Sequence, residues 1–247
     1  MGEVRDRSRP DLTPALSVVV PVYNEGENAE GTLRGIVEHV HARPLEVLVV
    51  YDFDEDTTVP VVQRLEKEMP ELKLHRNRIG RGVLNAIKSG LGAATAPFVL
   101  VTMGDASDDP ADIDAMYALA QDGADVVAGS RYMRGGRQIG GPLLKRTMSR
   151  AAGLSLHWVG GLPVHDATSN FRLYSRRLLD QVTIESTGGF ELGIELTVKA
   201  HRLGMRVAEV PTTWRDRTAG TSRFRLWNWL PRYLHWYWRG VGARFVR

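Results

Sequence analysis

The chain has 247 residues, of which 43% are hydrophobic and 25% are charged, as in an ordinary globular protein with a sizeable core. It has no cysteine, which excludes disulfides, thiolate catalysis and cysteine-based zinc sites. Seven arginines and no acidic residue follow Asp216. Because the whole chain carries a net charge of +3, the first 216 residues carry −4.

Runs of β-branched residues predict strands, and apolar residues at helical spacing predict helices. In chain order we expect a strand over 16–22, a helix around 33–40, a strand over 45–50, a helix over 59–69, a short strand over 72–74, a helix over 82–94, a strand over 97–102, a helix over 110–120 and a strand over 125–128. Further on we expect a helix over 143–159, a strand over 171–174, a helix over 191–203 and a strand over 206–210. Nearly continuous apolar strands that alternate with helices predict an α/β fold, with a mostly parallel Rossmann-like sheet and helices on both faces.

The domain organisation follows from composition. Residues 1–14 are polar and lack an apolar stretch of signal-peptide length, so we expect a disordered arm. Residues 15–222 are predicted to form one domain, and residues 223–247 a basic, aromatic C-terminal extension. Pro231 is expected to break or kink any helix there. No run of about 18 apolar residues occurs, so no transmembrane helix is expected.

Polar residues follow three of the predicted strands, after Val22, Val50 and Thr102. In parallel sheets, ligands bind beyond the carboxyl ends of the strands. Asp52 and Asp105 come directly after apolar runs, where carboxylates can hold a divalent cation or a nucleoside. Asp56 and Asp109 are equally well explained as helix N-caps.

Several motifs of other enzyme classes are absent. The Gly80-Arg-Gly82 turn lacks the third glycine and the first-strand position of a dinucleotide fingerprint, so a close backbone approach at a helix start explains it better. There is no Gly-Lys-Ser/Thr phosphate loop and no Gly-x-Ser-x-Gly elbow. The seven histidines show no metal-binding spacing.

A series of motifs recurs in a recognisable order: Pro21-Val-Tyr-Asn-Glu25, the Asp52 loop, Asn77–Gly82, the Asp105 loop, Gly129-Ser-Arg-Tyr132, Asp166–Arg172 and Glu209–Arg217. Together they resemble the family 2 glycosyltransferases of the GT-A fold, in the polyprenyl (dolichyl) phosphate mannose and glucose synthase branch. The resemblance covers about residues 16–225. It implies inverting transfer of a hexose, with mannose favoured, from GDP-mannose or UDP-glucose to a lipid monophosphate, with Mg²⁺ or Mn²⁺.

The resemblance also implies roles for single residues. Pro21, Tyr23, Glu25, Asp52 and Gly82 would line the donor site. Asp105 would bind the metal and the donor and would act in catalysis together with Arg131 and Arg217, which would bind the diphosphate or the acceptor phosphate. Arg223 would join them at the acceptor phosphate. Surface ion pairing is the competing interpretation of Arg131 and Arg217.

One departure from the family pattern concerns the metal. Met103 stands where the first carboxylate of the Asp-x-Asp motif is expected, and a thioether is a poor ligand for Mg²⁺. Asp105, diphosphate oxygens and water could complete an octahedron, and Asp108 or Asp109 could contribute instead. Metal dependence is therefore expected with a single motif carboxylate.

The chemistry of the acceptor agrees with these parts. A metal ion and arginines stabilise charge that develops on a leaving nucleoside diphosphate. A phosphate monoester, with a second pKa of about 6, is already a nucleophile near neutrality, whereas a hydroxyl acceptor requires a general base.

The C-terminal extension combines arginines with six tryptophans and tyrosines, Trp227, Trp229, Tyr233, Trp236, Tyr237 and Trp238. Such a mixture is typical of the headgroup level of an anionic membrane. We therefore expect peripheral association with the cytoplasmic face of a membrane through residues 143–159 and 223–247. Packing of these aromatics on the domain or at a subunit interface is the alternative.

Other functions stay open at this point. A soluble, polysaccharide or natural-product acceptor is the alternative within enzymes, and a non-catalytic or nucleic-acid-binding protein is the alternative of another class. Nucleic acid is not expected as a partner, because the body of the chain is net acidic and contains no recognised binding module. The oligomeric state is not predicted.

Overall fold

The structure is a computed structural model that describes residues 13–188, 191–216 and 226–243, with side chains in the last range from 231 to 242. The strands are β1 (Leu16–Pro21), β2 (Leu45–Tyr51), β3 (Leu72–Arg76), β4 (Phe98–Val101), β5 (Val126–Ser130), β6 (Arg137–Ile139), β7 (Arg172–Ser175), β8 (Val207–Pro211) and β9 (Thr213–Arg215). The helices are α1 (Asn28–His39), α2 (Val59–Leu65), α3 (Val83–Ala93), a 3-10 turn (Pro110–Asp112), α4 (Ile113–Gln121), α5 (Leu143–Trp158), α6 (Arg176–Gln181), α7 (Leu192–Arg202) and α8 (Leu226–Ala243).

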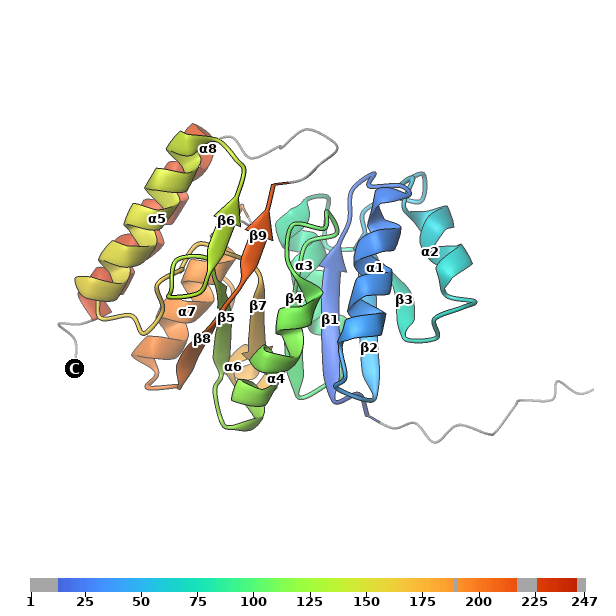
Figure 1. Cartoon of the computed structure of the whole chain (residues 1–247), viewed down its shortest axis with the longest axis horizontal. Coiled ribbons are helices and arrows are strands. Elements are labelled where there is room, and N and C mark those ends of the chain that lie inside the picture. Colours follow the sequence, from blue (N-terminus) through green and yellow to red (C-terminus); the bar gives the residue numbers. More distant parts are fainter. Residues whose placement is uncertain (1–12, 189–190, 217–225, 244–247) are drawn as a thin grey trace, which may run out of the picture.

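Within the described residues, the main sheet has seven strands in the order β3-β2-β1-β4-β7-β5-β8 (Figure 1). All neighbours are parallel except β7, which runs antiparallel to β4 and β5. The prediction of a mostly parallel sheet is confirmed. The reversal of β7 has a consequence for the site: its amino end lies at the edge where β1, β2, β4 and β5 have their carboxyl ends.

Two apolar cores lie on opposite faces of the sheet because alternate strand residues point to opposite sides. Val18 and Val20 of β1 pack with α1, α2 and α4, whereas Val19 packs with α3 and α7. Gly90 lets α3 approach β1 closely, since a Cβ there would lie 2.4 Å from Val19 Cγ1. Helices therefore cover both faces, as predicted.

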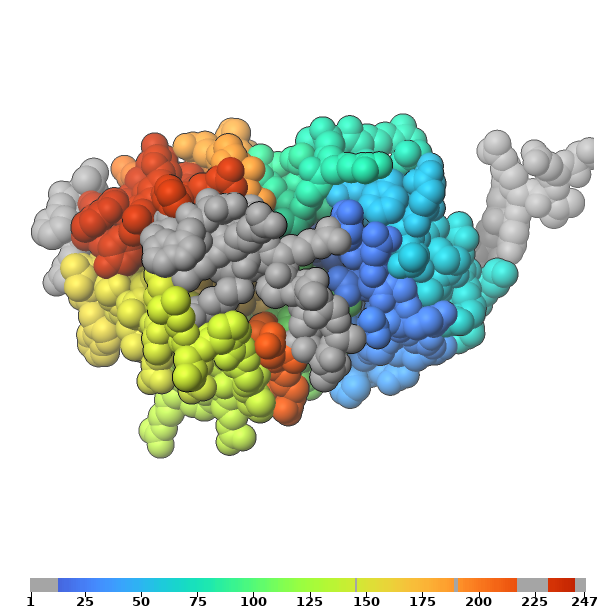
Figure 2. All heavy atoms as spheres, turned by 90° about the horizontal axis from the view of Figure 1, so that it is seen from above, coloured from blue at the N-terminus to red at the C-terminus, as the bar shows by residue number. Residues whose placement is uncertain are grey.

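Helices α5 and α8 lie side by side beyond the sheet, outside α7 (Figures 1 and 2). Tyr237 Oη donates to Ser155 Oγ at 3.0 Å, and Trp236 is 3% exposed in the core beneath α8. Pro231 was expected to break or kink any helix, and it does not break one, because α8 continues through it. Pro231 is the sixth residue of α8, so it removes one intrahelical hydrogen bond near the start of the helix.

Some element boundaries differ from the prediction. Helix α1 starts at Asn28, five residues before the first residue of the predicted apolar pattern, because the turn of Glu25 and Gly26 opens it. The helix predicted over 110–120 divides into the 3-10 turn and α4. Four elements were not predicted: α6, α8 and the short ribbon of β6 and β9.

Candidate active site

The first half of the candidate site lies at the carboxyl ends of β1 and β2. Asp52 follows β2, and its two carboxylate oxygens accept hydrogen bonds from Asn77 Nδ2 and Gly82 N, both at 2.8 Å. Gly82 has a φ of 123°, a conformation that favours glycine, and it starts α3. Asp52 therefore holds the 77–82 loop in place, and each carboxylate oxygen keeps a lone pair for a ligand.

Aromatic rings border this half of the site. Tyr23, which is 39% exposed, meets the Phe53 ring edge-on at a centroid distance of 5.5 Å. The Arg81 guanidinium lies 5.0 Å from the centre of the Phe53 ring. Pro21 ends β1, and the backbone N–H of Glu25 donates to Thr58 Oγ1 at 3.1 Å. These residues lie at the carboxyl ends of β1 and β2, and their role as donor residues stays a prediction.

Asp56 and Asp109 stabilise turns. Asp56 is buried and accepts hydrogen bonds from Asn24 N at 3.0 Å and Thr58 N at 2.8 Å. Asp109 caps the 3-10 turn by accepting from Ala111 N at 3.1 Å. The N-cap interpretation of Asp109 is confirmed, and Asp109 is not among the described residues that line the cavity below.

The loop after β4 carries a closely spaced pair of carboxylates. Asp105 Oδ1 accepts from Ser107 N at 3.2 Å, and Asp108 Oδ2 accepts from Thr102 Oγ1 at 3.1 Å and from Met103 N at 3.5 Å. Burial, followed by the charge of Asp105, raises the pKa of Asp108 to about 7. The carboxylate of Asp108 thus lies beside residue 103, where the Asp-x-Asp motif has an aspartate and this chain has Met103.

Arg131 and Asp166 form the second charged unit of the site. Arg131 Nε and Nη2 donate to the two oxygens of Asp166 at 2.6 and 3.0 Å. The Asp166 side chain is 0% exposed and that of Arg131 is 12% exposed. Although burial opposes its ionisation, the Arg131 guanidinium holds the pKa of the Asp166 carboxyl below its ordinary value. Arg131 therefore belongs to a buried ion pair, and the competing surface interpretation is wrong.

Three hydroxyl groups surround this ion pair. Arg131 Nη2 also donates to Thr168 Oγ1 at 2.9 Å and to Ser149 Oγ at 3.2 Å. Tyr132 Oη is 2.5 Å from Ser149 Oγ. Ser149 belongs to α5, so this helix is joined by hydrogen bonds to the arginine. Sequence reasoning missed Ser149 and Thr168, and only the position of Ser149 on the inner face of an amphipathic helix could have pointed to it.

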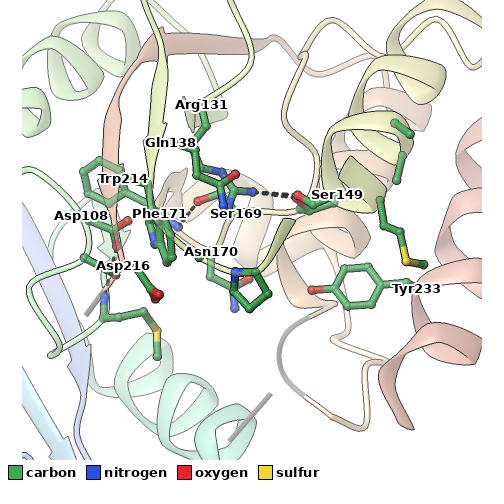
Figure 3. A pocket seen from close by; sticks show the side chains of 18 of the residues that line it. Asp108, Arg131, Gln138, Ser149, Ser169, Asn170, Phe171, Trp214, Asp216 and Tyr233 are labelled. Atoms are coloured by element: carbon green, nitrogen blue, oxygen red, sulfur yellow. Dashed lines mark hydrogen bonds between the residues drawn. The ribbon is translucent and has the colours of Figure 1, made fainter. Parts of the chain in front are cut away.

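Residues of the 105–108 loop, together with Arg131, Ser149 and Thr168, line one cavity of about 740 Å³ (Figure 3). Asp108, Asp216 and Trp214 lie on one side of it, and Ser149 and Tyr233 on the other (Figure 3). Residues of α5 and α8 supply the apolar wall: Met148, Ala151, Ala152, Tyr233, Leu234 and Tyr237. Asp105 and Arg131 line the polar part. Asp52 is not among the described residues that line the cavity.

The charges around the cavity are unbalanced. Among the described lining residues, three carboxylates, from Asp105, Asp108 and Asp216, face one guanidinium, from Arg131. That guanidinium is already paired with Asp166. A diphosphate placed here would meet a net negative field unless a cation or further arginines accompanied it.

Two of the predicted site residues, Arg217 and Arg223, fall outside the described residues. In the described part of the chain, no group of three His, Cys, Asp or Glu side chains is placed to hold a metal ion, and no helix is both long and apolar enough to cross a membrane.

Known proteins resemble this chain in sequence and in fold. Residues 17–183 match the profile of Glycosyl transferase family 2. The polyprenol monophosphomannose synthase of Mycolicibacterium smegmatis is 32% identical over 214 residues, which cover 83% of this chain and 79% of that protein. The undecaprenyl-phosphate mannosyltransferase of Micrococcus luteus is 31% identical over 212 residues, which cover 83% and 85%.

Among solved structures, a mannosyltransferase from Pyrobaculum calidifontis, in complex with GDP-Man and Mn²⁺, superposes with a TM-score of 0.61 at 22% identity. The match covers 86% of this chain and 59% of that one. This chain belongs to glycosyl transferase family 2 and is a glycosyltransferase of the GT-A fold. The predicted resemblance to the polyprenyl phosphate mannose synthase branch is confirmed.

Proposed function

We propose that this family 2 glycosyltransferase transfers mannose from GDP-mannose to a polyprenyl monophosphate at a membrane surface. The observation that carries the proposal is the two-sided cavity. Carboxylates and Arg131 line one part of it, and the apolar residues of α5 and α8 line the other. A lipid phosphate has the same division, with a charged head and an apolar chain. The mannose and the polyprenyl acceptor are supported by the names of the relatives.

The residues at hand fit a divalent cation, although Met103 replaces one motif carboxylate. Asp105 and Asp108 both line the cavity, and burial, followed by the charge of Asp105, raises the pKa of Asp108. Two carboxylates with diphosphate oxygens and water make an all-oxygen ligand set of the kind that Mg²⁺ and Mn²⁺ accept. When bound, the cation would neutralise charge on the leaving diphosphate. Asp108 therefore takes the place of the missing carboxylate in this proposal.

The remaining site residues would bind the donor and orient the acceptor. The rim of Pro21, Tyr23, Glu25 and Asp52 would hold the nucleoside, with Gly82 fixing the loop beside it. Arg131, held by Asp166, would present its guanidinium to the acceptor phosphate together with the Ser149 hydroxyl. Arg217 and Arg223 would add positive charge there. The phosphate attacks the anomeric carbon directly, so no side chain has to remove a proton.

The outer faces of α5 and α8 fit a membrane surface. Exposed apolar side chains there are Leu143 (75%), Leu144 (58%), Trp158 (70%) and Trp238 (65%). Exposed arginines on the same helices include Arg150, Arg232 and Arg239. The prediction that Trp236 faces the lipid is wrong, because Trp236 lies in the protein core. Apolar and aromatic groups beside cations are typical of proteins that lie on anionic bilayers.

Transfer can be tested directly with radiolabelled GDP-mannose, a short polyprenyl phosphate and Mn²⁺. Label is expected in the lipid extract with the lipid phosphate and not with free sugars or the unphosphorylated polyprenol. The Asp105→Ala variant is expected to lose this activity. Transfer to a free sugar with none to lipid phosphate contradicts the proposed acceptor. Equal rates for Asp105→Ala and the parent contradict the proposed site.

Membrane association can be tested by flotation with vesicles that contain anionic lipid. The parent is expected to float, and a Leu143→Glu/Leu144→Glu variant is expected to stay largely in the soluble fraction. Leu203→Glu is a matched control, because Leu203 is 52% exposed but follows α7 and belongs to neither α5 nor α8. The proposed surface is contradicted if the parent protein does not float. It is also contradicted if the Leu203→Glu variant stays in the soluble fraction, as the Leu143→Glu/Leu144→Glu variant is expected to do.

A further inference from the structure

The ribbon of β6 and β9 presents two different faces. The strands are parallel, and their register pairs Arg137 with Thr213, Gln138 with Trp214, and Ile139 with Arg215. Because side chains alternate along a strand, only the middle pair points inward. Gln138 and Trp214 line the cavity, whereas Arg137, Ile139 and Arg215 are exposed on the outer face. The inward pair has no function in the chemistry described so far.

Backbone hydrogen bonds place this ribbon beside the carboxylate loop. Arg215 N donates to Ser107 O at 2.9 Å, which joins β9 to the loop between Asp105 and Asp108. Thr212, the residue between β8 and β9, donates its N–H to Ser130 O at 3.0 Å, which joins the start of the ribbon strand to the end of β5. These two hydrogen bonds hold Trp214 between the 105–108 loop, which would carry the metal, and the end of β5, which Arg131 follows. Figure 3 shows Trp214 next to Asp108 on this side of the cavity.

The two side chains offer what a pyranose ring requires. The half-buried indole of Trp214 is a flat apolar surface against which the C–H groups of a sugar can pack. Gln138 Oε1 accepts from Tyr132 Oη at 3.1 Å, and within the described residues its Nε2 donates no hydrogen bond. That amide nitrogen can therefore donate to a sugar hydroxyl.

The order of groups along the donor makes the hexose the natural occupant. With the nucleoside at the β1–β2 rim and the diphosphate at Asp105, the sugar is the next group and extends into the cavity toward Trp214. We propose that Trp214 and Gln138 bind the hexose of the donor, with the indole as a stacking surface and the amide as a hydroxyl ligand. This proposal rests on the proposed glycosyl transfer and adds the residues that recognise the sugar.

The test separates sugar binding from nucleotide binding. Dissociation constants of GDP-mannose and of GDP are measured by isothermal titration calorimetry with Mn²⁺, with UDP-glucose and UDP as a second pair. Trp214→Leu is expected to raise the dissociation constant of the sugar nucleotide by about fivefold to tenfold, which is the effect of losing one aromatic contact. The dissociation constant of the nucleotide without the sugar is expected to stay unchanged. Gln138→Ala is expected to act in the same direction. Trp214→Phe, which keeps a ring, is expected to lose less than Trp214→Leu.

Ile139→Ala is the matched control, because Ile139 neighbours Gln138 in the same strand but points outward and is 44% exposed. It is expected to bind both ligands like the parent. If Trp214→Leu and Gln138→Ala keep the parent ratio of the two dissociation constants while the parent still transfers mannose, the sugar-binding proposal is overturned and the proposed function stands. If the parent binds neither sugar nucleotide, the proposed function itself fails.

Discussion

The buried ion pair between Arg131 and Asp166 connects two segments of the site, and the effect of its removal on the free energy of unfolding can be measured. Replacing Arg131 by Met removes the guanidinium that pairs with a carboxylate that is 0% exposed, and leaves Arg172, which donates to the Asp166 backbone carbonyl, as a nearby positive charge. The backbone N–H groups of Thr168 and Ser169 still donate to Asp166 Oδ1, at 3.1 and 3.3 Å, but they carry no full charge. Breaking a buried pair by removing one partner costs about 3–5 kcal/mol of unfolding free energy.

A double-mutant cycle shows whether this cost arises from the pair. Arg131→Met, Asp166→Ala and the double variant are unfolded in urea and followed by circular dichroism. Each single variant is expected to lose about 3 kcal/mol or more, equivalent to a fall in melting temperature on the order of 10 °C. The double variant is expected to lose about 2–3 kcal/mol less than the two single losses together, because neither member of the pair is then left without the other.

The control is Arg137→Ala, which removes an exposed arginine from the neighbouring β6 strand and is expected to change stability by less than about 0.5 kcal/mol. Losses that add to within about 0.5 kcal/mol would refute the reasoning, because independent sites behave in that way. Activity gives a second reading. Arg131→Met is expected to reduce transfer on the order of 100-fold at temperatures where it is fully folded, if its guanidinium also binds phosphate.

Three further results are expected. Asp105→Ala should abolish Mn²⁺ binding in the presence of GDP and Asp108→Asn should weaken it at least about tenfold, measured by calorimetry; unchanged affinity in both would contradict the two-carboxylate site. Because the folded pKa of Asp166 lies below the ordinary 3.8, its contribution to stability is present above that pH and is lost as the pH falls through the folded value. Acid unfolding of Asp166→Asn should lack this part of the pH dependence. If the unfolding free energy of the variant depends on pH as that of the parent does, Asp166 does not contribute in this way. Gly90→Ala should cost about 1–3 kcal/mol in thermal unfolding because its Cβ would meet a β1 valine at 2.4 Å, whereas Gly92→Ala on the same helix meets nothing within 4 Å and should be neutral or stabilising.

Much of the fold could be predicted because its signals are local. The apolar runs of β1, β2, β4 and β5 and the helical spacing of α5 and α7 depend on neighbouring residues alone, so their positions agree with the structure to within a few residues. The short ribbon of β6 and β9 was missed because three-residue strands carry too little pattern. Helix α8 was missed because Pro231 gave a local signal against it, which packing of Trp236 against the core overrides.

The site divides in the same way. Asp52 and Asp105 could be found from the sequence, since a carboxylate directly after an apolar strand is a local feature. The partners of these groups could not. Asp166 reaches Arg131 across 35 positions because β7 runs antiparallel and delivers the 166–171 segment to the carboxyl edge of its neighbours. Strand direction depends on which strands pair, and that pairing is decided by burial over the whole sheet.

The sequence by itself determined the α/β class, the family, the carboxylates after β2 and β4, and the basic aromatic character of the C-terminal extension. Only the tertiary structure decided that Arg131 is a paired, buried charge, that Asp108 returns a carboxylate to the position beside Met103, and that Trp214 and Gln138 face the same cavity as both. The physical reason is the range of the interactions. Propensity and periodicity act over a few residues, whereas ion pairs, cavities and strand register join segments that meet only when the chain is folded.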